Sequence, residues 1–230
     1  MVAWVSAGRK RLVGHAVFKV RGPMKNNTLR VRVFTDRLQE ARALVQRYHY
    51  AVRFPTAVKH VSCWALDEAT PALAACVFSQ PPTRWSENVG ELSRLVRAEN
   101  VSLPPLSSLV AAAVRNVKRN NIFDLVVSFA DSTQGHHGGV YQACNWHYHG
   151  QRKAAMDGVI VGGVFYGGRA AVHKWGTRSP TKLQEMGVDA TAHMDQGKHL
   201  YWLSLGASGD QKADRLGLRK NKYIKPGAVR

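Results

Sequence analysis

The pattern of apolar and polar positions predicts alternating strands and helices in the first half of the chain. Alternation in LRVRVFT (29–35) predicts a strand, and apolar positions at helical spacing in DRLQEARALVQRYHY (36–50), capped by Asp36, predict a helix. The apolar runs HVSCWALDE (60–68) and ALAACVFSQ (72–80), split by a turn, predict an antiparallel hairpin. ELSRLVRAE (91–99) predicts a further strand with one polar face.

The second half continues the same alternation. A long helix is expected in LSSLVAAAVRNVKRN (106–120) after a Pro-Pro entry, a buried strand in DLVVSFAD (124–131), and one or two helical turns in GGVYQACNW (138–146). Later strands are expected in MDGVIVGGVFYGG (156–168), whose glycines can bend a strand or bring its backbone close to a ligand, and in KHLYWLSLG (198–206), with a short helix in SPTKLQEMG (179–187) between them. This order predicts a mixed α/β fold.

Charge narrows the choice of partner. The 230 residues contain 33 Lys and Arg against 15 Asp and Glu, a net charge of +18, and such a field concentrates polyanions such as nucleic acid. No repeat or glycine-serine linker divides the chain. We therefore expect one domain over 28–207, a basic extension over 1–27 and a basic tail over 208–230, the two ends being flexible arms that contact phosphates.

The cysteines and the length of the hydrophobic runs indicate the cellular compartment in which the protein is expected. Cys63, Cys76 and Cys144 have no paired spacing, which favours a reducing compartment and buried, unbridged side chains. The start of the chain has no apolar stretch of signal-peptide length, and no run reaches the roughly 18 apolar residues of a membrane helix. The expectation is a soluble cytosolic protein without a membrane partner.

One stretch, VSFADSTQGHHGGVYQACNWHYHG (127–150), joins a strand, an acidic residue, a glycine and histidine cluster and aromatic residues. Together with the order of elements, it resembles the GNAT-like N-acetyltransferase fold, which implies a mostly antiparallel central sheet flanked by helices. In that fold a short helix carries aromatic residues, and VYQACNW is similar to it. Tyr141 stands at the tyrosine position, with Asn145 at a glycine and Trp146 at a phenylalanine position.

Several ordered motifs together resemble a narrower group, the Mom family of phage proteins. They are YHYAVRFP, ELSRLVRAE, ADSTQGHHGGVYQACNWHYHG and KHLYWLSL, and they span roughly residues 45 to 205. The resemblance implies an enzyme acting in the cytoplasm of a bacterial host. It would convert adenine in double-stranded phage DNA to a carbamoylmethyl form and so protect that DNA from restriction.

The family pattern carries over residue by residue, and it implies that Arg94 and Asp131 lie near the chemistry. The stretch NVSLPPLSS (100–108) departs from the pattern, with Pro and Leu in place of polar residues, and Ser108 aligns there with a family serine. The other matching positions are His49, Tyr50, Glu91, Gln134, Gly135, His136, Gly138, Tyr141, Gln142, Asn145 and Trp146.

Three of these residues suit catalysis, and each has a structural alternative. A carboxylate at a strand end can take a proton from the poorly nucleophilic adenine amine, so Asp131 is a candidate base, or a helix cap. Tyr141 could protonate a departing oxygen or orient the donor, or serve as a core residue. The Arg94 guanidinium normally seeks phosphate or carboxylate, or it could pair with Glu91 or Asp131.

His49 and Tyr50 are also candidate catalytic residues, and they end a helix, where a histidine can instead complement the helix dipole. The remaining candidates would bind or position substrate. Trp146, Tyr148 and Trp175 could stack an extruded adenine or pack in the core. His136, His137, His147 and His149 lack a carboxylate or Cys at tetrahedral spacing, so phosphate or base contacts are favoured over a metal. The substrate-binding set comprises Ser108, Gln134, His136, Gln142, Asn145, Trp146 and Tyr148.

The donor can also be inferred in part. RAENVSLPPLSS (97–108) contains no glycine, whereas acyl-coenzyme A enzymes of this fold use a glycine-rich loop there, which argues against acetyl-CoA as donor. The atoms added to adenine are those of a glycyl group, so glycyl-tRNA is favoured, with tRNA as a second partner. The alternatives are an acetyl-CoA-dependent acyltransferase acting on a protein or small amine, and a non-catalytic module that masks DNA sites.

Overall fold

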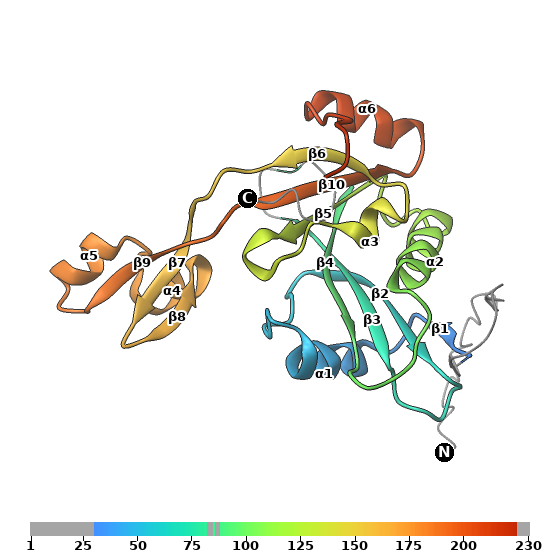
Figure 1. Cartoon of the computed structure of the whole chain (residues 1–230), viewed down its shortest axis with the longest axis horizontal. Coiled ribbons are helices and arrows are strands. Elements are labelled where there is room, and N and C mark those ends of the chain that lie inside the picture. Colours follow the sequence, from blue (N-terminus) through green and yellow to red (C-terminus); the bar gives the residue numbers. More distant parts are fainter. Residues whose placement is uncertain (1–29, 82–84, 86–87, 225–230) are drawn as a thin grey trace, which may run out of the picture. The chain divides into compact units, whose positions relative to one another are not determined.

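The computed structural model describes residues 30–81, 85 and 88–224 (Figure 1). The basic cluster between Arg9 and Lys25, and the last six residues, lie outside this part of the chain. The described residues form a mixed α/β structure, as the sequence predicts. Its strands make one sheet of seven in the order β1-β2-β3-β4-β5-β10-β6, mostly antiparallel and flanked by helices, and one sheet of three in the order β8-β7-β9.

The chain divides into two compact units, each built from two segments. The described part of unit 1 covers residues up to 126 together with 204–212, and unit 2 covers 127–203 together with the chain from 213. Unit 1 contains β1 (Arg32–Phe34), α1 (Leu38–Tyr48), β2 (Val58–Ala65), β3 (Ala74–Ser79), β4 (Val89–Arg97) and α2 (Leu106–Arg119). The strand β5 (Leu125–Asp131) begins in unit 1 and ends in unit 2.

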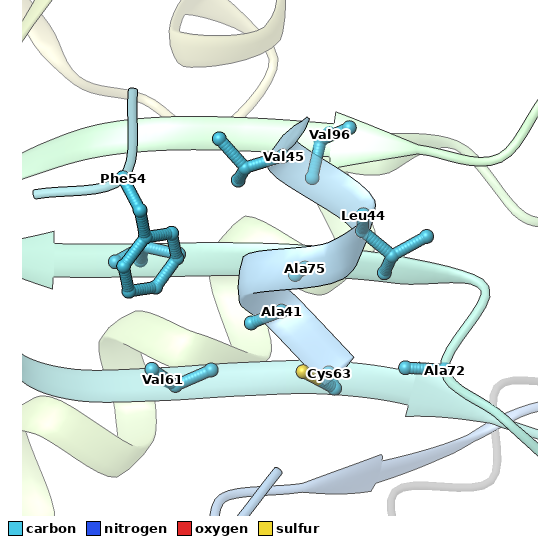
Figure 2. Close-up of a cluster of buried hydrophobic side chains, with 10 residues drawn as sticks. Ala41, Leu44, Val45, Phe54, Val61, Cys63, Ala72, Ala75 and Val96 are labelled. Atoms are coloured by element: carbon cyan, nitrogen blue, oxygen red, sulfur yellow. The ribbon is translucent and has the colours of Figure 1, made fainter. Parts of the chain in front are cut away.

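The strands β1 to β4 of unit 1 pair antiparallel in chain order, so the predicted hairpin of β2 and β3 is confirmed. All six residues of β3 are buried, which requires cover on both faces of the sheet. Helices α1 and α2 both pack against β3. Figure 2 shows α1 lying across β2, β3 and β4, with Leu44 and Val45 directed into a cluster that includes Phe54 and Val96.

The start of α1 differs from the prediction. The helix begins at Leu38 with Arg37 as its N-cap residue, so Asp36 is not the cap. The Arg37 guanidinium donates to the carbonyl oxygens of Thr70, Asp67 and Glu68 at 2.5 to 2.9 Å, and the Glu40 carboxylate accepts from the Ala72 N–H at 2.6 Å. These bonds attach the first turn of the helix to the turn between β2 and β3.

Unit 2 contains two parts that are separate in topology. One part holds most of β5, the single-turn helices η1 (Ser132–Gln134) and α3 (Gly139–Gln142), and the antiparallel pair β6 (His147–Gln151) and β10 (Lys198–Ser204). The chain between β6 and β10 forms the three-stranded sheet, which we call the insert. It comprises β7 (Met156–Val161), β8 (Val164–Gly167), α4 (Gly168–Trp175), α5 (Pro180–Glu185) and β9 (Ala190–Met194).

The insert is more elaborate than its sequence pattern predicts. The stretch 156–168 is a two-stranded hairpin rather than one bent strand, because Gly162 and Gly163 take φ values of +55° and +76° and form its turn. At its base, Asp195 accepts from the N–H groups of Ala155 and Gly197 and from the Arg152 guanidinium. Burial acts to raise the pKa of Asp195, but these hydrogen bonds outweigh it and hold the pKa below its ordinary value.

Residues 207–224 form a helix and a hydrogen-bonded segment, whereas the sequence predicted a flexible basic arm over 208–230. Residues Ala207–Arg215 form α6, where the Lys212 ammonium contacts the Asp124 carboxylate at 2.6 Å. In unit 2 the Trp202 indole N–H donates to the Arg219 carbonyl oxygen at 2.9 Å, and the Tyr223 hydroxyl donates to the Trp146 carbonyl oxygen at 2.9 Å. The basic residues 219 to 222 therefore belong to a packed segment.

The three cysteines all lie in the described part of the chain, and none of them forms a disulfide bond. Cys63 and Cys76 are buried as predicted, whereas Cys144 is partly exposed. Burial, together with the nearby Glu40 carboxylate, raises the pKa of the Cys63 thiol to about 12. Among the described residues, no helix has the length and apolar character needed to cross a membrane.

Candidate active site

In unit 1, the predicted residue Arg94 holds the loop that follows α1. Its Nε donates to the Ala51 carbonyl oxygen at 3.1 Å and one terminal nitrogen donates to the Arg53 carbonyl oxygen at 2.7 Å. The other terminal nitrogen donates to the carbonyl oxygen of Ser93 at 2.6 Å. The strand register shifts at this point, so Arg94 projects from a bulge in β4. These contacts make Arg94 the residue that positions the 49–53 loop.

Burial and two neighbouring side chains affect the pKa of Arg94 in opposite directions. Burial lowers the pKa of Arg94, whereas Tyr50 and Glu91 act to raise it. Backbone carbonyl acceptors were not among the partners expected from the sequence, which were phosphate, Glu91 and Asp131. A guanidinium has five N–H donors in a fixed fork, and three of its donors here reach backbone oxygens.

His49 and Tyr50 stand at the start of this loop. His49 is the C-cap residue of α1, and its Nδ1 accepts a hydrogen bond from the Ala51 N–H at 2.9 Å. Its ring stacks on Tyr50 with centroids 4.5 Å apart and an interplanar angle of 27°. Tyr50 is 48% exposed, and the loop ends at the buried Phe54 (Figure 2). The loop thus presents an aromatic side chain from a backbone fixed at both ends.

Ser108 lies in the first turn of α2 and is half-buried. Its N–H donates to the Pro105 carbonyl oxygen at 2.9 Å, as the start of a helix requires. A role in binding substrate stays a prediction for this residue.

In unit 2, Asp131 ends β5 and is 7% exposed. Its Oδ1 accepts from the Thr133 N–H at 3.0 Å, so the carboxylate caps the helical turn η1, as one of the two predicted roles requires. Its Oδ2 lies 3.4 Å from the Lys198 ammonium, a partner that the sequence did not reveal. One oxygen therefore serves the backbone while the other faces a cation, and capping leaves room for a second role.

The loop after Asp131 turns on two glycines. Gly135 and Gly138 take φ values of +68° and +83°, in the left-handed region that glycine adopts readily. The His136 N–H donates to the Asp131 carbonyl oxygen at 3.0 Å, and the side chains of Gln134 and His136 are exposed. The GHHGG stretch is therefore a tight turn that presents polar side chains beside the end of β5.

The floor of this loop is Tyr201 of β10. A Cβ atom at Gly138 would lie 2.1 Å from the Tyr201 ring, so only glycine fits above it. The Tyr201 hydroxyl donates to the His137 carbonyl oxygen at 2.6 Å and accepts from Gln142 Nε2 at 2.9 Å. Burial raises the pKa of Tyr201, and the hydrogen bond from Gln142 opposes this shift.

Three tyrosines and a histidine gather around this point. The Tyr141 ring lies 5.3 Å from Tyr201, and the hydroxyls of Tyr141 and Ser128 are 2.8 Å apart. Tyr148 lies 5.1 Å from Tyr201, and its hydroxyl is 3.0 Å from Nδ1 of the buried His199. Burial, with a contribution from Tyr201, raises the pKa of Tyr148 to about 12. Burial, together with His137, lowers the pKa of His199.

Asn145 and Trp146 have structural explanations. Asn145 takes φ +59° just after α3, and the Trp146 N–H donates to the Tyr141 carbonyl oxygen at 3.0 Å. This is the left-handed ending of a helix, which tolerates Asn as well as Gly. Trp146 has no exposed surface and packs against the Tyr141 ring at 5.3 Å. These observations favour the core alternative over a stacked adenine for Trp146.

Trp175, His147 and His149 make contacts with neighbouring residues of unit 2. Trp175 packs against Tyr166 inside the insert, with ring centroids 4.8 Å apart. His147 packs on Trp202, and His149 Nδ1 accepts from the Arg219 N–H at 3.0 Å. Within the described residues, no group of three or more His, Cys, Asp and Glu side chains is arranged to hold a metal ion.

Sequence reasoning missed Lys198, His199 and Tyr201, which all lie on β10. The motif KHLYWLSL was recognised as part of the family pattern, but its residues were given no role. His199 and Tyr201 alternate around the apolar Leu200, and this was an available signal, because side chains two positions apart in a strand share a face. Lys198 is not part of this alternation.

The sequence of the chain was compared with models of known protein families. The sequence model of the Mom protein family matches residues 29–225. No curated protein matches the chain.

Solved structures provide distant matches. A GNAT family acetyltransferase from Elizabethkingia anophelis with acetyl-CoA bound aligns with 76% of this chain and 97% of its own, at 8% identity and a TM-score of 0.45. An IAA acetyltransferase from Bacillus cereus aligns with 75% and 99%, at 9% identity and a TM-score of 0.43. Likeness at this level carries no conclusion about the reaction. The family match spans most of the sequence and all the candidate residues, and the chain therefore belongs to the Mom protein family.

Proposed function

We propose that this protein is a phage DNA-modifying enzyme that converts the exocyclic amine of adenine to the carbamoylmethyl form. Membership of the Mom family over residues 29–225 is the observation that carries this proposal. The net charge of +18 supports a nucleic-acid substrate, because neutralising phosphates releases counterions and favours binding. The modified base would protect phage DNA from restriction in the bacterial cytoplasm.

The Asp131 carboxylate is proposed as the general base. The lone pair of the adenine amine is delocalised into the ring, so the amine attacks an acyl group only when it is positioned and relieved of a proton. Asp131 Oδ1 is held by the Thr133 N–H, which fixes the carboxyl group, and Oδ2 faces the Lys198 ammonium at 3.4 Å. The ionised carboxylate is the form able to accept a proton.

Tyr141 is proposed to serve the departing oxygen. The hydroxyls of Tyr141 and Ser128 are within hydrogen-bonding distance at 2.8 Å. Tyr141 can give its proton to the departing oxygen and take a proton from the Ser128 hydroxyl. This is the role of a general acid supported by a second donor. Tyr141 is buried apart from 7% of its surface, so an acyl ester would meet it in a partly desolvated setting.

The donor is proposed to be glycyl-tRNA. The adenine amine attacks the glycyl carbonyl carbon, the bond to the tRNA hydroxyl oxygen breaks, and that oxygen takes up the proton lost by the amine. The free glycyl amine then attacks C6 of the purine through a five-membered ring, and the original C6–N bond breaks. The second step is an isomerisation, and it leaves the original adenine nitrogen as the terminal amide nitrogen of the product.

This route gives an isotope test with purified components. Duplex DNA is incubated with the protein and tRNA charged with glycine labelled with ¹³C and ¹⁵N, and the nucleosides are weighed. The product should carry both carbons and the nitrogen of glycine. Mild acid hydrolysis of its amide should release unlabelled ammonia and leave ¹⁵N bonded to C6.

Each alternative outcome has a distinct meaning. A product that carries both glycine carbons but has unlabelled nitrogen bonded to C6 would show that the adenine nitrogen stays on the ring, and the rearrangement would be wrong. An acetyl group on adenine, formed from acetyl-CoA in a parallel reaction, would exclude the glycyl donor. Protection of DNA that disappears when protein is removed, with no new nucleoside mass, would exclude modification altogether.

A further inference from the structure

The insert has one face that its own helices leave uncovered. Helices α4 and α5 pack on the sheet through Val159, Ala171, Leu183 and Ala190. Because side chains alternate along a strand, the neighbours of Val159 in β7, Gly158 and Ile160, belong to the opposite face. Ile160 is paired with Phe165 of β8, and Gly158 is paired with His193 of β9.

Phe165 and His193 meet across the middle strand on this face. Their ring centroids are 4.6 Å apart with an interplanar angle of 55°. A Cβ atom at Gly158 would lie 2.5 Å from the Phe165 ring, so the glycine leaves the space that the ring occupies. We call Phe165, His193 and the intervening Gly158 the aromatic strip.

The strip is held in place and accessible. His193 Nδ1 lies 2.7 Å from Asp157 Oδ1, which fixes the orientation of the imidazole. Phe165 is 49% exposed, and the adjacent Val164 at the hairpin turn is 55% exposed. A large aromatic ring that is fixed by its neighbours, faces away from the core and stays half exposed is suited to contact a partner.

Charge indicates what kind of partner this is. Residues 152 to 197 contain six Lys and Arg against four Asp and Glu, a net charge of +2. Two of the four acidic side chains, Asp157 and Asp195, already contact His193 and Arg152. A positively charged element with an exposed aromatic surface matches the way that proteins bind unpaired nucleic acid, with bases stacked on rings and cations near phosphates.

We propose that the aromatic strip stacks an unpaired base of the DNA substrate. The idea rests on the proposed function, since an enzyme that acts on a duplex base must take it out of the helix and so creates unpaired bases. The strip is two rings wide and has the Asp157 carboxylate beside it, which suits one or two bases locally and not a long run of phosphates. DNA opened at one position fits this size better than the extended single-stranded end of a tRNA.

Binding measurements test the strip without any chemical step. The full protein is titrated with a short single-stranded DNA that carries one 2-aminopurine, whose fluorescence is quenched by stacking, and separately with a matched duplex. Phe165→Ala should weaken single-strand binding by about 5-fold to 150-fold and relieve the quenching, because each stacked base contributes roughly 1–3 kcal/mol. Duplex affinity, set by phosphate contacts, should stay within about twofold.

Matched variants separate stacking from other effects. Phe165→Trp should retain binding and quenching, while Phe165→Leu keeps an apolar side chain without a π-face and should behave like Phe165→Ala. Val172→Ala removes a similarly exposed apolar side chain from α4 and should change nothing. Thermal unfolding of each variant shows whether the insert remains folded.

Two results would overturn the inference. One is a Phe165→Leu protein that binds and quenches like the wild type. The other is a Phe165→Ala protein that loses affinity for uncharged tRNA but keeps its affinity for single-stranded DNA. Both are read from binding alone, so they are independent of whether the wild-type protein transfers a glycyl group. Failure of the glycyl route would in turn leave the strip unaffected.

Discussion

The two loops that carry the candidate residues are fixed in different ways. In unit 1, Arg94 donates to the carbonyl oxygens of Ala51 and Arg53 in the 49–53 loop, and His49 Nδ1 accepts from the Ala51 N–H. In unit 2, the loop from Asp131 to Gly138 is held by a carboxylate cap, two left-handed glycines and the Tyr201 hydroxyl. Loss of Arg94 would remove two long-range hydrogen bonds from the first loop at once, whereas the support of the second loop is spread over several groups.

The comparison also separates residues that position from residues that can react. Arg94 donates to three backbone oxygens, and the exposed Tyr50 lies in the loop that it holds. In the second loop the Asp131 carboxylate itself ends the strand, with one oxygen facing Lys198. The first loop thus presents an aromatic side chain for contact, and the second presents an ionisable group suited to proton transfer.

The largest expected effect comes from removing the Arg94 side chain, which donates two hydrogen bonds to the first loop. Arg94→Met should lower the free energy of unfolding by about 2–4 kcal/mol, since it leaves three carbonyl oxygens without their charged donor. Urea unfolding measures this loss. Arg53→Gln, at an exposed position of the same loop, should cost less than about 0.5 kcal/mol. An Arg94→Met protein of unchanged stability would contradict the positioning role.

The tyrosine cluster of unit 2 predicts a loss of stability at high pH. The pKa of Tyr148 is about 12 in the folded protein and about 10 when the chain is unfolded. Above pH 10 the unfolded chain can lose this proton while the folded protein cannot, so stability is full below pH 10 and declines between pH 10 and 12. The decline should reach about 2–3 kcal/mol. Tyr148→Phe should flatten this part of the curve, and an unchanged curve would contradict the assignment.

Two glycines of the second loop offer a matched pair. Gly138→Ala should cost about 2–3 kcal/mol, because its Cβ would meet the Tyr201 ring at 2.1 Å and its φ is +83°. Gly135→Ala has φ +68° but no atom within 4 Å of its Cβ, so only the backbone term of about 1 kcal/mol remains. Chemical denaturation of both variants should show this order, and equal losses would mean that Tyr201 gives way freely.

The smallest effect is expected at the end of α3. Asn145→Gly should leave stability unchanged or raise it by a few tenths of a kcal/mol, and Asn145→Ala should lower it by about 1 kcal/mol, since φ is +59°. Thermal unfolding gives both values. A large loss in Asn145→Gly would show that the Asn145 side chain makes a contact that the backbone geometry does not explain.

Much of the fold could be predicted because its elements have strong periodic patterns. The strand ending at Asp131, the helix α2 and the hairpin of β2 and β3 all follow from apolar runs bounded by turn residues. The strand β6 was missed because His147–Gln151 contains histidines and glycine in place of an apolar run. Helix α6 was missed because Ala207–Arg215 is mostly polar, and polar helices have little periodic signal.

The candidate site was less accessible to sequence reasoning. The cap at Asp131 could be foreseen because it involves the nearby Thr133. The Lys198 partner lies far along the chain, and nothing local indicates it. The acceptors of Arg94 are backbone oxygens, which every residue possesses, so no residue type marks them. Local geometry leaves a signature in sequence, and long-range pairing leaves much less.

The role of Asp131 is tested most directly by replacing it with asparagine. Asn caps helices as well as Asp does, so Asp131→Asn should keep the Thr133 hydrogen bond and remain within about 1 kcal/mol of wild-type stability. The amide cannot accept a proton from the adenine amine, so formation of the modified nucleoside in a single turnover should slow by at least about 100-fold, with DNA affinity unchanged. A stable Asp131→Asn protein that modifies adenine at the wild-type rate would contradict the account.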